Sequence, residues 1–194
     1  MTLPRRDTQY HTYGEYLTWP DDRREELIDG VAYIKEPPAP TRVHQKLLGD
    51  LHYQLRAALE GKPYDIYLAP FDVRLPKADE ADEDVDTVVQ PDLLIVRDLD
   101  KLDDRGMRGP PDWLAEILSP STAHHDRVTK LAAYERAGVR EVWLVNPMNR
   151  TLTLYQLQDG RYGPPILQSL SGKTSLTAIP GLHVDWDRLL SGLK

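Results

Sequence analysis

The sequence predicts a mixed α/β (α+β) protein in which helices flank a mixed central sheet. Two observations predict this class. Residues 112–145 read as a strand–helix–strand unit, which is typical of parallel central strands. Residues 24–34 read as an antiparallel hairpin. The length of 194 residues fits one domain, residues 1–194, with a substantial core.

The N-terminal part of the chain contains a hairpin and a helix. Asp29-Gly30 is a favoured pair for a two-residue type I′ turn and predicts the hairpin at residues 24–34. Apolar residues then recur at helical spacing through residues 42–60. Thr41 can cap the first turn of this helix, and Gly61 can end its last.

Two segments of different character follow the helix. Residues 65–75 carry regularly placed apolar side chains and predict a strand. Residues 79–86 form an acidic tract without the central glycine or the ligand spacing of an EF-hand. We therefore expect a solvated, mobile loop there rather than a calcium site.

The second half of the chain contributes the predicted core. Apolar runs predict buried strands at residues 88–96, 113–118 and 141–145, followed by an alternating strand at 151–155. Because Pro91 has no N–H to donate, the first of these strands should be at an edge or locally bulged. Residues 119–122 can cap a helix from about 123 to 137, which Gly138 would end.

Composition excludes several classes of protein. No apolar run approaches the roughly 18 residues that span a bilayer, and no apolar segment follows the N-terminus, so we expect neither a membrane helix nor a signal peptide. The absence of cysteine excludes disulfides and thiol catalysis and suits a cytoplasmic protein. The net charge of −7 is not that of a strongly basic nucleic-acid binder. A nucleic-acid role would need a local basic groove or bridging metal ions.

The most informative residues are two acids inside apolar strands. Asp92 and Glu116 each lie in a run where an unpaired carboxylate would cost several kcal/mol or more. Alternation places Glu116 with Leu114 and Leu118 on one face of its strand, near the strand's carboxyl end, where open α/β sheets bind ligands. Lys130 follows on the next predicted helix. Two acids and a lysine are the minimal set for metal-dependent phosphodiester cleavage.

Each candidate also has a structural interpretation. Glu116 could pair with a buried arginine, and Asp92 could accept hydrogen bonds from backbone amides at a strand end. Lys130 could form a surface ion pair with Asp126, four residues earlier, and the spacing alone favours this. Glu26, beside another charge in a hairpin, reads most simply as exposed. His44, on the apolar stripe of its helix, reads as a core histidine, and His124-His125, near a helix start, read as solvated.

An ordered set of short motifs resembles the Uma-two type family of restriction-endonuclease-like proteins in the PD-(D/E)xK nuclease superfamily. The resemblance covers about residues 12 to 190, and its pieces are Glu26-Leu27-Ile28-Asp29-Gly30, His44, Gln90-Pro91-Asp92-Leu93, Glu116-Ile117-Leu118-Ser119-Pro120-Ser121-Thr122, Asp126, Lys130, Tyr134 and Gly138-Val139-Arg140-Glu141-Val142-Trp143. The superfamily signature has a lysine two residues after the glutamate. Leu118 stands there, and the resemblance implies that Lys130 takes that place.

The resemblance implies a restriction-endonuclease-like core and a set of roles. Asp92 and Glu116 become metal ligands for Mg²⁺ or Mn²⁺, and Lys130 and Glu26 become further catalytic residues. His44, Asp126 and Tyr134 become accessory residues. The implied substrate is nucleic acid, most simply DNA, cut by an endonuclease.

Two other functions compete with this interpretation. A non-catalytic nucleic-acid-binding or assembly protein could use the same fold, because a fold alone does not establish an activity. A glycosidase could use two carboxylates, but this explains neither the lysine nor the burial of both acids. Since cutting both strands of a duplex needs two active centres, the endonuclease hypothesis also predicts a two-fold symmetric homodimer.

Overall fold

The computed structural model describes residues 3, 5–20, 25–34 and 41–192. The α-helices are α1 (Tyr13–Tyr16), α2 (Arg42–Ala58), α3 (Leu131–Ala137) and α4 (Trp186–Ser191). Shorter turns of 3₁₀-helix are η1 (Asp82–Asp84) and η2 (Leu99–Lys101), and η3 (His125–Lys130) is a π-helical segment that continues into α3. No helix of the described residues is long and apolar enough to cross a membrane.

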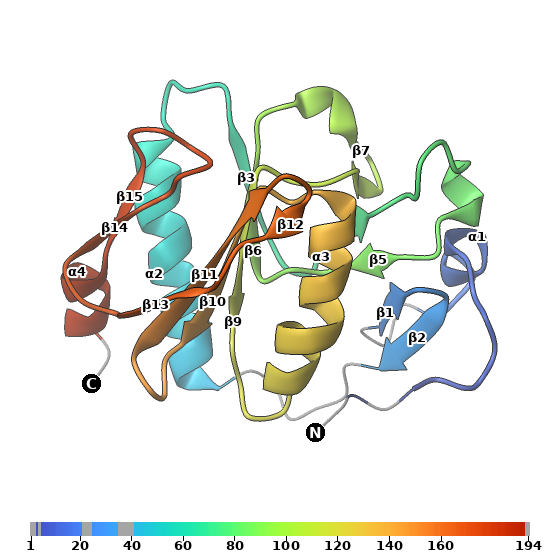
Figure 1. Ribbon diagram of the computed structural model, residues 1–194, viewed down its shortest axis with the longest axis horizontal. Coiled ribbons are helices and arrows are strands. Elements are labelled where there is room, and N and C mark those ends of the chain that lie inside the picture. The colour runs from blue at the N-terminus through green and yellow to red at the C-terminus, as the bar shows by residue number, and fades with distance from the viewer. Residues whose placement is uncertain (1–2, 4, 21–24, 35–40, 193–194) are drawn as a thin grey trace.

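A mixed sheet forms the centre of the molecule (Figure 1). Its strand order is β12-β11-β10-β9-β6-β3, and β13 also pairs with β11. Only the β9–β10 pair is parallel among these pairs of described strands, which confirms the predicted strand–helix–strand unit. The strands are β3 (Asp65–Leu68), β6 (Leu93–Val96), β9 (Trp113–Ile117), β10 (Glu141–Asn146), β11 (Thr151–Gln158), β12 (Arg161–Tyr162) and β13 (Ile166–Ser169).

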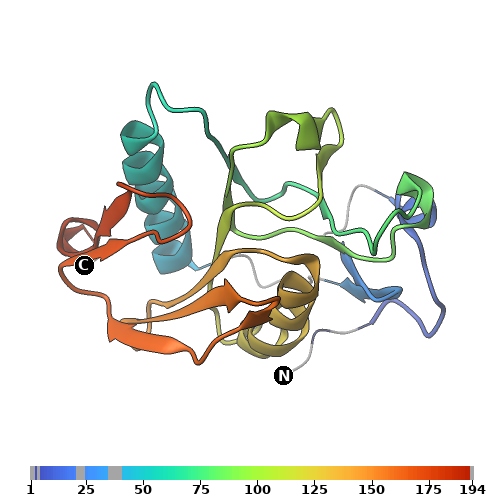
Figure 2. The ribbon, with the colours of Figure 1, turned by 45° about the horizontal axis from the view of Figure 1, so that its top comes forward.

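A second sheet carries the N-terminal hairpin beside this centre (Figure 2). Its order is β2-β1-β5-β4-β8-β7, with β4 and β8 parallel. The strands are β1 (Glu25–Ile28), β2 (Val31–Ile34), β4 (Val73–Arg74), β5 (Val88–Val89), β7 (Leu102–Asp103) and β8 (Gly106–Arg108), and a separate pair joins β14 (Lys173–Ser175) to β15 (His183–Asp185). The mixed α+β class is thus confirmed.

The two faces of β9 carry different cores. Trp113, Ala115 and Ile117 pack with the leucines of α2 on one face. Leu114 and Leu118 pack with Ala133 and Tyr134 of α3 on the other. The predicted alternation along this strand is confirmed, and it puts the Glu116 side chain on the α3 side.

The predicted hairpin turn and the predicted start of α2 are confirmed, whereas α2 ends at Ala58, two residues earlier than expected. The hairpin turn has positive φ at both Asp29 (51°) and Gly30 (72°), as a type I′ turn requires. Arg24, the first residue of the predicted hairpin, lies outside the described residues. The Thr41 side chain accepts a hydrogen bond from the His44 amide and caps α2, as expected.

Three predictions were wrong in detail. Residues 65–75 and 88–96 are not continuous strands; each splits at a proline, Pro70 or Pro91, and continues in the other sheet. A proline cannot extend a ladder, so the chain leaves one sheet there and joins the next. The strand after Pro91, β6, is consequently internal rather than at an edge. The acidic tract is not merely solvated, because Asp86 is buried and accepts from Lys77 and Tyr10.

Candidate active site

A lysine and two glutamates lie together in the core between the sheets. The Nζ of Lys130 is 2.6 Å from Oε1 of Glu116 and 2.9 Å from Oε1 of Glu26. All three side chains are at most 2% exposed. Tyr134 donates to the same Glu116 oxygen at 2.5 Å, and the Gln90 amide donates to Glu26 at 2.8 Å. Each buried glutamate therefore has a cationic partner, although a single lysine serves both.

The π-helical segment explains how one helix supplies two of these groups. In an α-helix, residues five apart point about 140° away from each other, whereas in a π-helix their backbones are hydrogen-bonded and stack. His125 and Lys130 are such a pair, and both reach Glu26: Nε2 of His125 is 3.2 Å from Oε2. His125 is buried against the Tyr33 ring, with centroids 4.7 Å apart.

Asp92 joins the cluster through the backbone. It lies between β5 and β6, where the chain passes from one sheet to the other. Its Oδ2 accepts from the Ile117 amide at 2.7 Å, and its own amide points at Oε2 of Glu116 at 3.4 Å. These reciprocal contacts hold the two carboxyl groups next to each other on neighbouring antiparallel strands, β6 and β9.

Asp92 is also the part of the cluster that meets solvent. Its side chain is 18% exposed and lines a cleft of about 220 Å³ with His44, Leu48 and Leu68. Nε2 of His44 is 3.2 Å from Oδ2 of Asp92, and no partner in the described residues reaches its buried Nδ1. A small ligand can therefore approach the acids from the α2 side.

The cluster changes the proton affinity of its bases. Burial alone would lower the pKa of Lys130, but the charges of Glu116 and Glu26 outweigh it and raise this pKa well above its ordinary value. Burial likewise opposes protonation of His44, while its hydrogen bond to Asp92 and the nearby acids raise the pKa overall. Burial, followed by the Glu116 charge, raises the pKa of Tyr134. Lys130 is thus a permanent cation here.

The residues fit a hard metal ion of the magnesium type. No group of three or more histidine or acidic side chains suited to a metal occurs among residues 3, 5–20, 25–34 and 41–192. Mg²⁺, however, often uses one or two protein carboxylates and completes its shell with water and substrate phosphate. Asp92 and Glu116 are two such carboxylates, adjacent and with access to water through Asp92.

The structure brings the sequence-selected residues together and corrects several interpretations. Asp92, Glu116, Lys130 and Glu26 converge, and Tyr134 and His44 contact them. Glu26 is fully buried rather than exposed, since it faces β5 and η3. The expected Lys130–Asp126 contact is not a surface pair, because both side chains are buried, and at 4.0 Å it is longer than the contacts of Lys130 with Glu116 and Glu26. His44 is a near-buried histidine with an acidic partner.

Sequence reasoning missed two members of the cluster. His125 was expected to be solvated, but it is fully buried against Glu26, while its neighbour His124 is exposed. Gln90 binds both charges through its backbone, donating to Glu26 and accepting from Lys130 at 3.3 Å. A π-helix has no simple periodic pattern in the sequence, so the role of His125 could not be predicted. A backbone contact does not depend on the side chain, so the role of Gln90 could not be predicted either.

Comparison with known proteins now adds an independent finding. Residues 13–187 match the Uma2 family, whose description reads "Putative restriction endonuclease". The chain belongs to this family. None of the curated proteins compared with it matches.

A crystal structure gives the same architecture. It is that of "a putative nuclease belonging to DUF820 from Anabaena variabilis", which superposes with a TM-score of 0.73 over 94% of this chain and 99% of the other. At 18% identity this likeness shows the fold. The restriction-endonuclease-like resemblance inferred from the sequence is therefore confirmed, and family and fold support a nuclease.

Proposed function

We propose that this Uma2 protein is an endonuclease that hydrolyses DNA phosphodiester bonds with the help of Mg²⁺ or Mn²⁺. The observation that carries the proposal is the convergence of Lys130, Glu116 and Glu26 in the core beside a solvent-accessible Asp92. A core lysine clamped by two acids is costly to build. Lys130 lies beside the solvent-accessible carboxylate of Asp92, and a catalytic role there would explain why the chain buries these charges.

The metal would be held by Asp92 and Glu116, whose hard oxygens suit Mg²⁺ or Mn²⁺. When bound, such an ion lowers the pKa of a coordinated water and neutralises charge on a phosphate. The chain's own contribution is to hold these carboxylates still. The Ile117 amide fixes Asp92, while Tyr134 and Lys130 fix Glu116.

The remaining residues would act around this pair. Lys130 provides a permanent positive charge that stabilises the negative charge developing on the phosphate. Glu26 and His125 position Lys130, since Glu26 binds both. His44 borders the opening and orients Asp92. Asp126, 4.0 Å from Lys130, adds negative charge that helps keep the lysine protonated.

A second function, an inactive nucleic-acid-binding or assembly protein, is favoured by one observation. Glu116 is only 2% exposed, and its Oε1 already binds both Lys130 and Tyr134. A purely structural cluster would have the same contacts. The two functions differ in whether the protein cuts DNA.

Cleavage assays test the proposal directly. Purified protein is incubated with supercoiled, linear and single-stranded DNA and either Mg²⁺ or Mn²⁺. We expect ion-dependent cutting that Asp92→Asn lowers about 10²–10³-fold, the cost of losing one well-placed electrostatic group. Glu116→Ala serves as a second inactive variant. Asp98→Asn, at an exposed acid that caps η2, is the matched control and should cut normally.

The proposal fails if wild type and Asp92→Asn cut equally, because the activity then comes from a contaminant, or if the folded protein binds DNA without cutting it. The homodimer also remains part of the proposal. Light scattering at micromolar concentration should give twice the chain mass of 22.2 kDa. A monomer mass would remove the support for paired active centres.

A further inference from the structure

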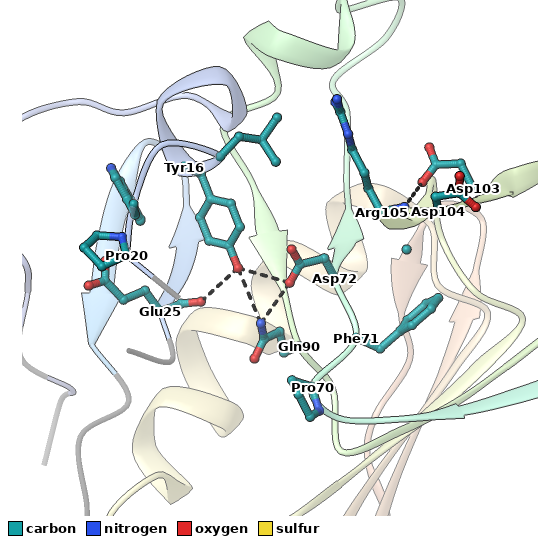
Figure 3. A pocket seen from close by; sticks show the side chains of 13 residues that line it. Tyr16, Pro20, Glu25, Pro70, Phe71, Asp72, Gln90, Asp103, Asp104 and Arg105 are labelled. Atoms are coloured by element: carbon teal, nitrogen blue, oxygen red, sulfur yellow. Dashed lines mark hydrogen bonds between the residues drawn. The ribbon is translucent and has the colours of Figure 1, made fainter. Parts of the chain in front are cut away.

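A separate cavity of about 540 Å³ is lined by Gln90 but by none of the lysine cluster's other residues (Figure 3). Its walls come from segments far apart in the chain: Tyr16 at the end of α1 and Trp19 just after it, Phe71 and Asp72 between β3 and β4, and Arg105 in the β7–β8 turn. The volume is in the range of pockets that take small molecules. A nucleobase fits easily within it.

The floor of the cavity presents a hydrogen-bond acceptor. Tyr16 donates to Oδ1 of Asp72 at 3.0 Å, and the side-chain amide of Gln90 donates to the same oxygen at 2.8 Å (Figure 3). The second Asp72 oxygen accepts from no described residue in these contacts and is left for a ligand. A half-buried carboxylate acceptor favours a ligand that donates hydrogen bonds and disfavours a phosphate group.

Aromatic rings line the same space. The ring centroids of Tyr16 and Trp19 are 5.2 Å apart with their planes tilted by 53°, and Phe71 is stacked on Tyr67 at 4.3 Å. The Arg6 guanidinium lies 4.6 Å from the centroid of the Trp19 ring, so a base would stack on the remaining aromatic faces. The cavity therefore combines a stacking surface with a polar edge.

Two of the three other acids that line the cavity form ion pairs within the chain. Arg6 binds Glu25 at 2.8 Å, and Arg74 binds Asp103 at 2.6 Å. Asp104 and Arg105 stand side by side at the rim with opposite charges. These pairings remove the reason to expect an organic cation. A neutral ligand with a donor group fits better.

Gln90 connects this cavity to the lysine cluster. Its side chain forms part of the cavity floor, while its backbone donates to Glu26 and accepts from Lys130. Asp92 follows two residues later. Ala69 lines the Asp92 cleft and the next residue, Pro70, lines the cavity, so a strand whose phosphate lay at Asp92 would extend toward the cavity.

We infer that the cavity binds an unstacked nucleobase with an exocyclic amino group, such as cytosine, and that Asp72 accepts the hydrogen bond from this group. The inference rests on the proposed nucleic-acid substrate. Aspartate accepts from the cytosine amino group in known recognition chemistry, and unpaired bases are read by their edges while they stack on aromatic rings. The site thereby selects which nucleotide lies beside the cut phosphate.

Trp19 provides a direct readout. The other three tryptophans, Trp113, Trp143 and Trp186, are fully buried, whereas Trp19 is partly exposed on the cavity wall. Quenching of its fluorescence is titrated with heptanucleotides of thymidine that carry a central deoxycytidine, deoxyuridine or abasic site. The titration is done in EDTA so that nothing is cut. We expect deoxycytidine to bind about tenfold tighter than deoxyuridine, and the abasic strand to bind weakest.

Variants assign the preference to Asp72. Asp72→Asn can donate as well as accept and should abolish the preference for deoxycytidine, while Asp100→Asn, at an exposed acid outside the cavity, should retain it. If Asp72→Asn does not fold, Tyr16→Phe removes one of the two groups that orient the carboxylate and should reduce the preference. Melting curves check that each variant is folded.

The outcomes separate this inference from the proposed function. Equal affinity for the three strands would overturn the inference even in an active nuclease. So would quenching by spermidine but by none of the strands, which would make the cavity a cation site. A protein that prefers deoxycytidine but never cuts DNA would support the base site and overturn the proposed nuclease.

Discussion

Two buried cations in this protein, Lys130 and Arg74, each contact two carboxylates, but the two pairs of acids differ in their exposure to solvent. Arg74 is 1% exposed and binds Asp82 and Asp103 at 2.6 Å each, but these acids are 30% and 49% exposed. Lys130 is fully buried, and its partners Glu26 and Glu116 are 0% and 2% exposed. The Arg74 region thus buries one charged side chain, whereas the Lys130 region buries a lysine and two glutamates.

This difference in exposure means that burying charge costs more free energy around Lys130 than around Arg74, and packing does not explain the extra cost. The planar guanidinium of Arg74 binds its two acids on separate nitrogens, and both acids keep contact with water. Around Lys130 the acids are sealed in, and Asp126 brings a third carboxyl group to 4.0 Å. Such an excess of buried acid is typical of sites that bind another cation. The Arg74 region is a structural clamp, whereas the Lys130 region fits a metal-dependent site.

The largest expected effect is on the stability of Lys130→Met. This change keeps the bulk of the side chain but leaves Glu26 and Glu116 buried without their cation. Breaking a buried ion pair in this way costs about 3–5 kcal/mol. Urea unfolding at pH 7 measures it as a lower midpoint.

The matched control is Lys46→Met. Lys46 also forms an i,i+4 ion pair on a helix, with Asp50 at 2.6 Å, but both side chains are over one-third exposed. Its loss should cost at most about 0.5 kcal/mol. Similar losses in the two variants would contradict the distinction between buried and exposed pairing.

A double variant tests whether the stability lost in Lys130→Met comes from the uncompensated charge of Glu116. Adding Glu116→Gln to Lys130→Met removes one of the uncompensated charges at nearly constant volume. The double variant should therefore be more stable than Lys130→Met alone, with a coupling energy of about 1–3 kcal/mol. The four proteins of the cycle are compared by urea unfolding in EDTA. Additive losses would show that Lys130 and Glu116 do not depend on each other.

Arg74→Met should have an intermediate effect. The variant loses a guanidinium that lies 5.3 Å from the Tyr13 ring and donates to the Met107 carbonyl, but Asp82 and Asp103 can turn into water. We expect a loss of about 1–2 kcal/mol, mainly from packing and hydrogen bonding. A loss as large as that of Lys130→Met would mean that solvent access of the acids is not what separates the two regions.

Local sequence signals predicted the parts of the fold that local chemistry determines. Asp29-Gly30 predicted the hairpin turn, and Thr41 predicted the start of α2. The alternation through Glu116 predicted which side chains lie on each face of β9. The chain's passage between sheets at Pro70 and Pro91 was missed. Apolar residues occur within three positions on both sides of each proline, so the sequence shows one run where the fold has two strands in different sheets.

The candidate site was predictable to the extent that burial of charge is visible in a sequence. Asp92 and Glu116 stood out because their neighbours are apolar, whereas Glu26 stood beside another acid and looked exposed. Lys130 was a candidate from its place on the helix after the Glu116 strand, but its spacing from Asp126 favoured a surface pair, and the family resemblance supplied the argument for a catalytic role. His125 needed the π-helical geometry, and Gln90 acts on the cluster through backbone atoms that any residue possesses.

The smallest expected effect concerns pH and the Arg74 clamp. Burial works against ionisation of Asp103, but the hydrogen bond from Arg74 prevails and lowers the pKa of this carboxyl. The unfolded chain then binds the proton more tightly than the folded one, so the pair stabilises the protein above the unfolded pKa near 3.9 and loses this contribution as pH falls below it. Because Asp103 is half exposed, the contribution at pH 7 should be below about 0.5 kcal/mol. Urea midpoints of wild type and Asp103→Asn should therefore differ slightly at pH 7 and approach each other toward pH 3.5, with Asp104→Asn as the control. A difference that widens in acid would reverse the sign assigned here and would show that the water-accessible clamp stabilises the fold by some means other than the ionised Asp103.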